Sequence, residues 1–210
     1  MLVATQVAAA IAGPRSRTGT AVRRAQPKLE PVHLLHPERS ACESFIADRF
    51  QRAHGARIAH FSPHLLGVRD ALGRWRAASG YTPADRKRLF LEQYLDAPVE
   101  HVLGQHRGRA IKRDVIVEVG NLAAASMGMA RALIPLLAQH LDRLGYEWVV
   151  FTATRELRNT FARLGLHPVS LAPADRARLA ERGGDWGSYY DNDPVVMAGR
   201  ISHGIPRSRA

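Results

Sequence analysis

The sequence predicts a single α/β domain of the α+β type, in which a mixed central sheet is flanked by helices. Residues 115–119 and 148–151 are two short runs, mainly β-branched and apolar on both faces, as in strands covered by helices on each side. Between them, leucines recur at helical spacing from Leu133 to Leu144, and Gly145 marks the helix end. A strand, a helix of this length and a second strand predict a crossover that pairs the two strands in parallel.

The domain is expected to occupy residues 29–200. Residues 1–28 contain five basic residues and no acidic residue. We expect a disordered basic tail there rather than a signal peptide, because the stretch lacks a charged region at its start. Residues 201–210 are expected to form a second flexible tail.

Hydrophobic spacing and turn residues predict the other elements of the domain. Those expected before the crossover are a strand at 32–35, a helix at 37–50, strands at 58–69 and 73–80, and a helix at 86–95. Residues 101–113 are polar and contain glycine, so a loop or strand edge is expected there. After the crossover we expect a helix ending near residue 166, a charged surface helix at 174–182 and a last strand at 195–199. Glu92, in the expected helix at 86–95, either faces solvent or contacts a substrate.

Charge and cysteine content exclude several classes of protein. Of the net charge of +11, five charges lie in residues 1–28 and two more in Arg207 and Arg209. The mildly basic remainder argues against a nucleic-acid-binding surface. No apolar run is long enough to span a membrane, and the single Cys42 favours a reducing compartment, so we expect a cytoplasmic protein. His60 and His64 have the spacing of a metal pair on a helix, but Pro63 argues against a helix there, and no metal site is expected.

Glu118 is the only acidic residue in the apolar run 115–119, on the face opposite Val117 and Val119. A buried carboxylate has a raised pKa and can serve as a general base. Two alternatives are an ion pair with an arginine and a strand end open to water. Further along, Gly128 and Ala130 at the start of the long helix either allow an anion to approach the helix end or simply pack closely.

Three aromatic residues, Trp186, Tyr189 and Tyr190, follow the turn glycines 183–184. They either cap the end of the sheet or line a pocket. In a pocket, one of the tyrosines could supply a proton.

The crossover resembles the acetyl-CoA-binding half of the GNAT acyltransferase superfamily. There the first strand leads into a loop with the pattern Q/R-x-x-G-x-G/A, and the second helix ends in a Y-x-x-x-G-F type motif. The loop here reads ASMGMA over residues 125–130, so Ala125 stands where Gln or Arg is expected, and Phe161 stands at the tyrosine position. The runs VEVGNLAA, WVVFTAT, LRNTFARLGL and WGSYYDNDPVVMAG together resemble the thermostable hemolysin family over residues 30–200.

This resemblance implies a GNAT-like fold and an N-acyltransferase, distantly similar to acyl-homoserine lactone synthases. Glu118 would accept a proton from an amine or amino-acid acceptor, and Tyr189 or Tyr190 would protonate the departing thiolate. Backbone amides near Leu122 and Ala123 would stabilise the oxyanion. The residues expected to bind the donor are Asn121, Leu122, Ala123, Met127, Gly128, Ala130, Arg131 and Asn159.

The resemblance implies no permanently bound cofactor. The donor would be acyl-CoA or the phosphopantetheine of acyl-carrier protein. Since Ala125 replaces the Gln or Arg of the phosphate loop, tight binding of coenzyme A is not expected. Acyl-homoserine lactone synthases have a similar loss and accept acyl-carrier protein, an acidic partner that suits a mildly basic domain.

The family name gives the alternative function, a membrane-active hemolysin. Pore-forming proteins need long amphipathic hairpins or helices, usually with an export signal, and neither is evident in the sequence. Lysis of liposomes without any acyl donor would favour this alternative.

Overall fold

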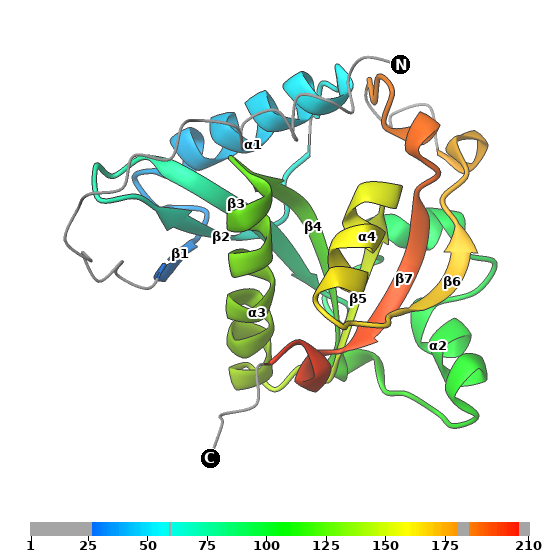
Figure 1. Ribbon diagram of the computed structural model, residues 1–210. Helices are drawn as coiled ribbons and strands as arrows, with labels where there is room; N and C mark the ends of the chain where they lie inside the picture. The colour runs from blue at the N-terminus through cyan, green and yellow to red at the C-terminus, as the bar shows by residue number, and fades with distance from the viewer. Residues whose placement is uncertain (1–26, 59, 180–184, 206–210) are drawn as a thin grey trace.

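The described strands form one seven-stranded mixed sheet in the order β1-β2-β3-β4-β5-β7-β6 (Figure 1). The computed structural model describes residues 27–58, 60–179 and 185–205. The strands are β1 (Leu29–Val32), β2 (His64–Arg69), β3 (Trp75–Pro83), β4 (Ile116–Ala124), β5 (Trp148–Ala153), β6 (Val169–Pro173) and β7 (Val195–Arg200). The α-helices within these residues are α1 (Arg39–His54), α2 (Val99–Arg107), α3 (Met127–Arg143) and α4 (Arg155–Arg163). The 3-10 helices are η2 (Phe90–Tyr94), η3 (Arg113–Val115), η4 (Arg176–Arg178), η5 (Tyr190–Asn192) and η6 (Ile201–Gly204).

The predicted crossover is confirmed as β4-α3-β5. β4 and β5 are parallel, with Ile116 opposite Trp148, whereas every other strand pair in the sheet is antiparallel. Gly145 follows α3 with a φ of 89°, a left-handed conformation that glycine adopts without strain. The mixed sheet flanked by helices therefore agrees with the predicted fold class.

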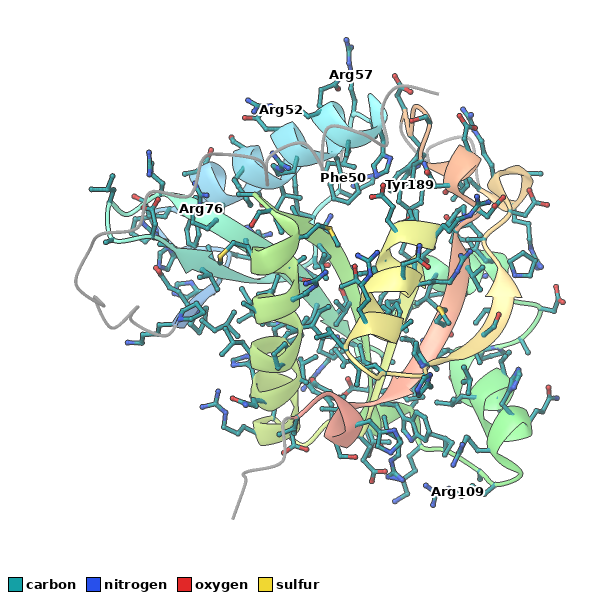
Figure 2. The ribbon with its side chains drawn as sticks, in the orientation of Figure 1. Phe50, Arg52, Arg57, Arg76, Arg109 and Tyr189 are labelled. Atoms are coloured by element: carbon teal, nitrogen blue, oxygen red, sulfur yellow. The ribbon has the colours of Figure 1, made fainter. Side chains whose placement is uncertain are left out.

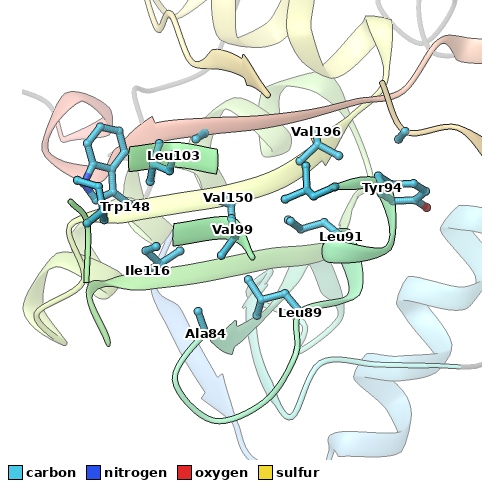
Figure 3. Close-up of a cluster of buried hydrophobic side chains, with 14 residues drawn as sticks. Ala84, Leu89, Leu91, Tyr94, Val99, Leu103, Ile116, Trp148, Val150 and Val196 are labelled. Carbon is cyan, nitrogen blue, oxygen red and sulfur yellow. The ribbon is translucent and has the colours of Figure 1, made fainter. Parts of the chain in front are cut away.

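Helices cover both faces of the sheet, so strand residues on each face are buried. On one face, Val117, Val119 and Phe151 pack against α3 and α4. On the other face, Ile116 and Val150 pack with residues of η2 and α2, as Figure 3 shows. α1 covers this second face further along, where a separate cluster is formed by Val32, Cys42, Ile46, Leu65, Trp75, Ala78 and Ala123.

The segment between β3 and β4 differs from the prediction. The expected helix at 86–95 is absent except for η2, and β3 continues through Pro83. Here the amides of Leu89, Phe90 and Leu91 donate to glutamate side chains, so they are not available for an α-helical ladder. The expected loop at 101–113 instead begins with most of α2, which buries Val99 and Leu103 and ends at Gly108.

The remaining boundaries also shift. The first strand ends at Val32 rather than beginning there, the expected strand at 58–69 begins only at His64, and β6 was not expected. Of the expected helix at 174–182, only the one turn of η4 forms, and residues 180–184 lie outside the described residues. The fold continues past residue 200, because Ile201 of η6 is buried, so the tail expected from 201 begins too early. The expected tail at 1–28 lies outside the described residues up to residue 26.

Candidate functional site

The parallel strands β4 and β5 separate at the centre of the sheet. Their ladder runs from Ile116 and Trp148 to Val119 and Phe151 and ends there. Among the described strands, residues 120–124 of β4 pair only with β3, and the end of β5 pairs only with β7. The backbone of β4 beyond Val119 thus faces a gap rather than a neighbouring strand.

A bulge in β4 accompanies this separation. The β3–β4 register shifts between Gly80 and Ala78, which lie opposite Gly120 and Ala123, so β4 has one extra residue there. Within the bulge Asn121 has a φ of 52°, in the left-handed region. Its side-chain oxygen accepts hydrogen bonds from the Ser62 amide (2.9 Å) and hydroxyl (3.2 Å), which stabilise the unusual backbone.

A cavity of about 650 Å³ occupies the gap. Its walls come from both faces of the sheet, since Glu118 and Tyr94 line it on one side and Phe151 and Phe161 on the other. The volume is within the range of small-molecule binding sites. On the α3 and α4 side its apolar lining comprises Ile134, Leu137, Ala138, Leu141, Val149, Phe151, Leu157, Phe161, Leu166 and Ile201.

Glu118 lies where the two strands separate, and it lines the cavity. Its carboxylate accepts the amides of Phe90 (2.8 Å) and Leu91 (3.0 Å) in η2. Burial raises the pKa of Glu118 to about 7, although the two amides act in the opposite direction. Among the described residues Glu118 has no ion-pair partner, so the arginine-pair alternative is wrong. The geometry is that of a carboxylate able to accept a proton near neutral pH.

Glu92 is buried and does not line the cavity that contains Glu118, so the expected solvent-facing position is wrong. It pairs with Arg113, with nitrogen–oxygen distances of 2.7 and 2.8 Å. It also accepts the amides of Leu89 (2.7 Å) and Val99 (2.9 Å). Burial acts to raise the pKa of Glu92, but the Arg113 guanidinium and these amides outweigh it and hold the pKa below its ordinary value. The pair fixes the loop whose amides hold Glu118.

The predicted tyrosines lie in an aromatic wall of the cavity. The hydroxyl of Tyr190 is 2.6 Å from that of Tyr94. Tyr189 packs against Trp186 and Phe50, and Figure 2 shows it facing Phe50 of α1. Burial raises the pKa of both Tyr189 and Tyr190, which keeps their protons on at neutral pH. The pocket alternative for the three aromatic residues therefore agrees with their positions.

The residues expected to bind the donor divide into two groups. Those that line the cavity are Asn121, Leu122, Ala123, Met127 and Ala130. The Asn121 side chain is engaged with the 60–62 segment, so only its backbone remains available. Gly128, Arg131 and Asn159 are exposed and are not part of the lining. Ser126 caps α3 by accepting the Met129 amide at 3.3 Å. Because Ser126 also lines the cavity, the N-terminal end of α3 lies beside it.

Sequence reasoning missed Tyr94, which lines the cavity, and Arg113, which pairs with Glu92 behind it. Glu92 and Arg113 are 21 positions apart, and Tyr94 is 96 positions from Tyr190. The only local signal was that Glu92 and Tyr94 stand next to apolar residues in the sequence. A charged residue that packs among Leu89, Leu91 and Leu95 requires a partner.

Comparison with solved structures shows that the fold is similar to that of several known proteins. The AHL synthase LasI superposes with a TM-score of 0.57 at 10% identity, covering 88% of this chain and 98% of that chain. FeeM, an N-acyl amino acid synthase from uncultured soil microbes, gives a TM-score of 0.56 at 14% identity over 85% and 93% of the two chains. A candidate N-acetyltransferase from Lactobacillus plantarum gives 0.52 at 11% identity over 84% and 99%.

The sequence matches no curated protein. Among the described residues, no helix has both the length and the apolar character needed to cross a membrane. Residues 32–205, most of the chain, match the family described as Thermostable hemolysin. This protein therefore belongs to the thermostable hemolysin family.

Proposed function

We propose that this protein is an N-acyltransferase, which moves an acyl group from a thioester to an amine. The observation that carries the proposal is Glu118, a carboxylate with a pKa of about 7 at the point where β4 and β5 separate. A base with a pKa near the working pH is the most effective general base. The gap beside it leaves β4 backbone free to pair with an extended pantetheine arm.

The reaction would proceed through a tetrahedral intermediate. The acceptor nitrogen attacks the thioester carbonyl carbon, and Glu118 takes the proton that the nitrogen releases. Amides of Leu122 and Ala123, on the part of β4 without pairing to β5, would stabilise the oxyanion. The C–S bond then breaks, and the departing thiolate takes a proton from Tyr190, whose hydroxyl is held by Tyr94.

The apolar part of the cavity favours a long acyl chain. Phe161 supplies an apolar ring there instead of a tyrosine hydroxyl, and its centroid lies 5.0 Å from that of Phe151. An acetyl group would leave most of this surface unburied, whereas each buried methylene contributes about 0.8 kcal/mol. We therefore expect longer acyl donors, carried on acyl-carrier protein or coenzyme A, to be preferred over acetyl-CoA.

The acceptor is proposed to be an amine that also carries a carboxylate. Lys87 and Arg88 line the cavity with Glu118 and would bind that carboxylate. FeeM, which has a similar fold, is described as an N-acyl amino acid synthase.

The test is transfer by purified protein. Acyl-CoA and acyl-carrier protein donors from C2 to about C14 are offered with a panel of amino acids and simple amines, and products are identified by mass spectrometry. We expect long-chain N-acyl amino acids to form, at a rate that falls in Glu118→Gln. Absence of transfer from every donor, together with lysis of liposomes without any thioester, would support the membrane-active alternative and refute the proposal.

A further inference from the structure

Three arginines gather beside the cavity on the α1 side. Arg49 and Arg52 lie one turn apart on α1, and Arg49 lines the cavity. Arg76 is half-buried on β3. α1 packs against β3, so these arginines belong to neighbouring elements. Burial, and after it the positive charges of Arg52 and Arg76, lowers the pKa of Arg49.

This cluster has no acidic counterpart in the described part of the chain, where none of the three arginines forms an ion pair. Two other half-buried arginines differ in this respect, since Arg69 pairs with Glu30 and Arg113 with Glu92. Like charges held together oppose the folded state unless an anion neutralises them. The cluster therefore has the composition of an anion-binding site.

Arg76 lies next to the loop that leads into α3. The amide of Ala125 donates to the Arg76 carbonyl at 2.8 Å, so the two residues are neighbours on adjacent strands. Ala125 is the position at which the resembled phosphate loop carries Gln or Arg. β3 thus places a guanidinium-bearing residue beside the position where β4 lacks one. Ser126 and Met127, the next two residues, line the cavity together with Arg49.

We propose that Arg49, Arg52 and Arg76 bind the phosphate of the phosphopantetheine arm that acyl-CoA and acyl-carrier protein share. Guanidinium groups form short, charge-assisted hydrogen bonds with phosphate oxygens, often two at a time. The site would anchor the far end of the arm while its thioester lies in the gap near Glu118. This inference rests on the proposed acyl transfer and names the part of the donor that the enzyme recognises.

The experiment compares donors that differ only in the phosphate. Binding of octanoyl-pantetheine and octanoyl-phosphopantetheine is measured by calorimetry, so that no turnover is required. We expect the phosphorylated arm to bind wild-type protein at least about tenfold more tightly, as a charge-assisted contact allows. In Arg76→Gln and in Arg49→Gln that preference should largely disappear, while affinity for octanoyl-pantetheine stays unchanged.

Arg109→Gln is the matched control. Arg109 is exposed and lies at the end of the molecule opposite Arg52 and Arg76 (Figure 2). Its loss should leave the preference for phosphate intact. Octanoyl-CoA and octanoyl-carrier protein are titrated separately, and the donor that binds more tightly than the isolated arm identifies the source of the phosphate.

Two results would overturn the inference: no preference of the wild type for the phosphorylated arm, or equal loss of both ligands in both arginine variants. Either result leaves acyl transfer standing if products still form and depend on Glu118. Conversely, binding that depends on phosphate without any acyl transfer would support the arginine site and refute the proposed reaction.

Discussion

Replacing Glu118 by glutamine separates its catalytic role from its structural one. The amide keeps the shape of the side chain but cannot accept the proton of the acceptor amine. Positioned general bases contribute on the order of 10²–10⁴ in rate, so kcat at pH 8 should fall by about that factor. Donor affinity should stay the same, because the α3 end of the cavity is untouched.

The stability of this variant follows from the pKa of Glu118. The pKa rises from 4.5 to about 7 on folding. At about 1.4 kcal/mol per unit, ionised Glu118 costs the folded state on the order of 3 kcal/mol. Because the folded-state pKa is the higher one, this cost is absent below about pH 4.5, where Glu118 is protonated in both states. The folded state therefore loses stability as the pH rises from about 4.5 to about 7.

Glutamine removes this cost, but it offers only one acceptor oxygen to the two amides of Phe90 and Leu91. Leaving one buried amide without an acceptor costs about 1–3 kcal/mol. The two effects nearly cancel at pH 8, so the melting temperature should change by only a few degrees. At pH 4, where wild-type Glu118 is already protonated, only the loss remains and the variant should be less stable than wild type.

The assay is kcat/KM against pH from 5 to 9, with thermal unfolding of both proteins at pH 4 and 8. We expect a limb with a midpoint near pH 7 in the wild type and its absence in Glu118→Gln, whereas a further rise from the acceptor amine should persist in both. A wild-type profile that is flat through pH 7, or a variant with undiminished kcat at pH 8, would refute Glu118 as the base.

Three further predictions concern the surroundings of Glu118. Glu92→Gln should lower the free energy of unfolding at pH 7 by about 3 kcal/mol, because the charge of Arg113 loses a buried partner. Since the pKa of Glu92 in the wild type is depressed, denaturant titrations should show this difference shrinking below about pH 4.5. Leu157→Trp fills part of the apolar side of the cavity, so kcat/KM for long-chain donors should fall at least about tenfold while kcat/KM for acetyl donors stays unchanged. An equal fall for both donors would argue against an acyl-binding site there. Tyr190→Phe should lower kcat about 10²-fold and Tyr94→Phe less, because only the first removes the proton donor; steady-state kinetics in which Tyr94→Phe is the more damaging would reverse the two roles.

The sequence by itself determined the crossover and the position of Glu118. The apolar runs around Val117 and Val150 and the leucine stripe between them are local patterns with the periods of strand and helix, so β4, α3 and β5 could be predicted. A single acidic residue in such a run is conspicuous without any structure. The family motifs added the expectation that Glu118 accepts a proton during acyl transfer.

Only the tertiary structure decided what surrounds that carboxylate. The segment at 86–95 has the composition of a helix, but Glu92 and Glu118 take its amides, and Glu118 reaches it from a strand 27 and 28 positions away. The Tyr94–Tyr190 contact likewise joins segments that are distant in the chain. Local propensity carries no information about such pairings, because the free energy that fixes them comes from burial and hydrogen bonds formed only when the sheet is assembled.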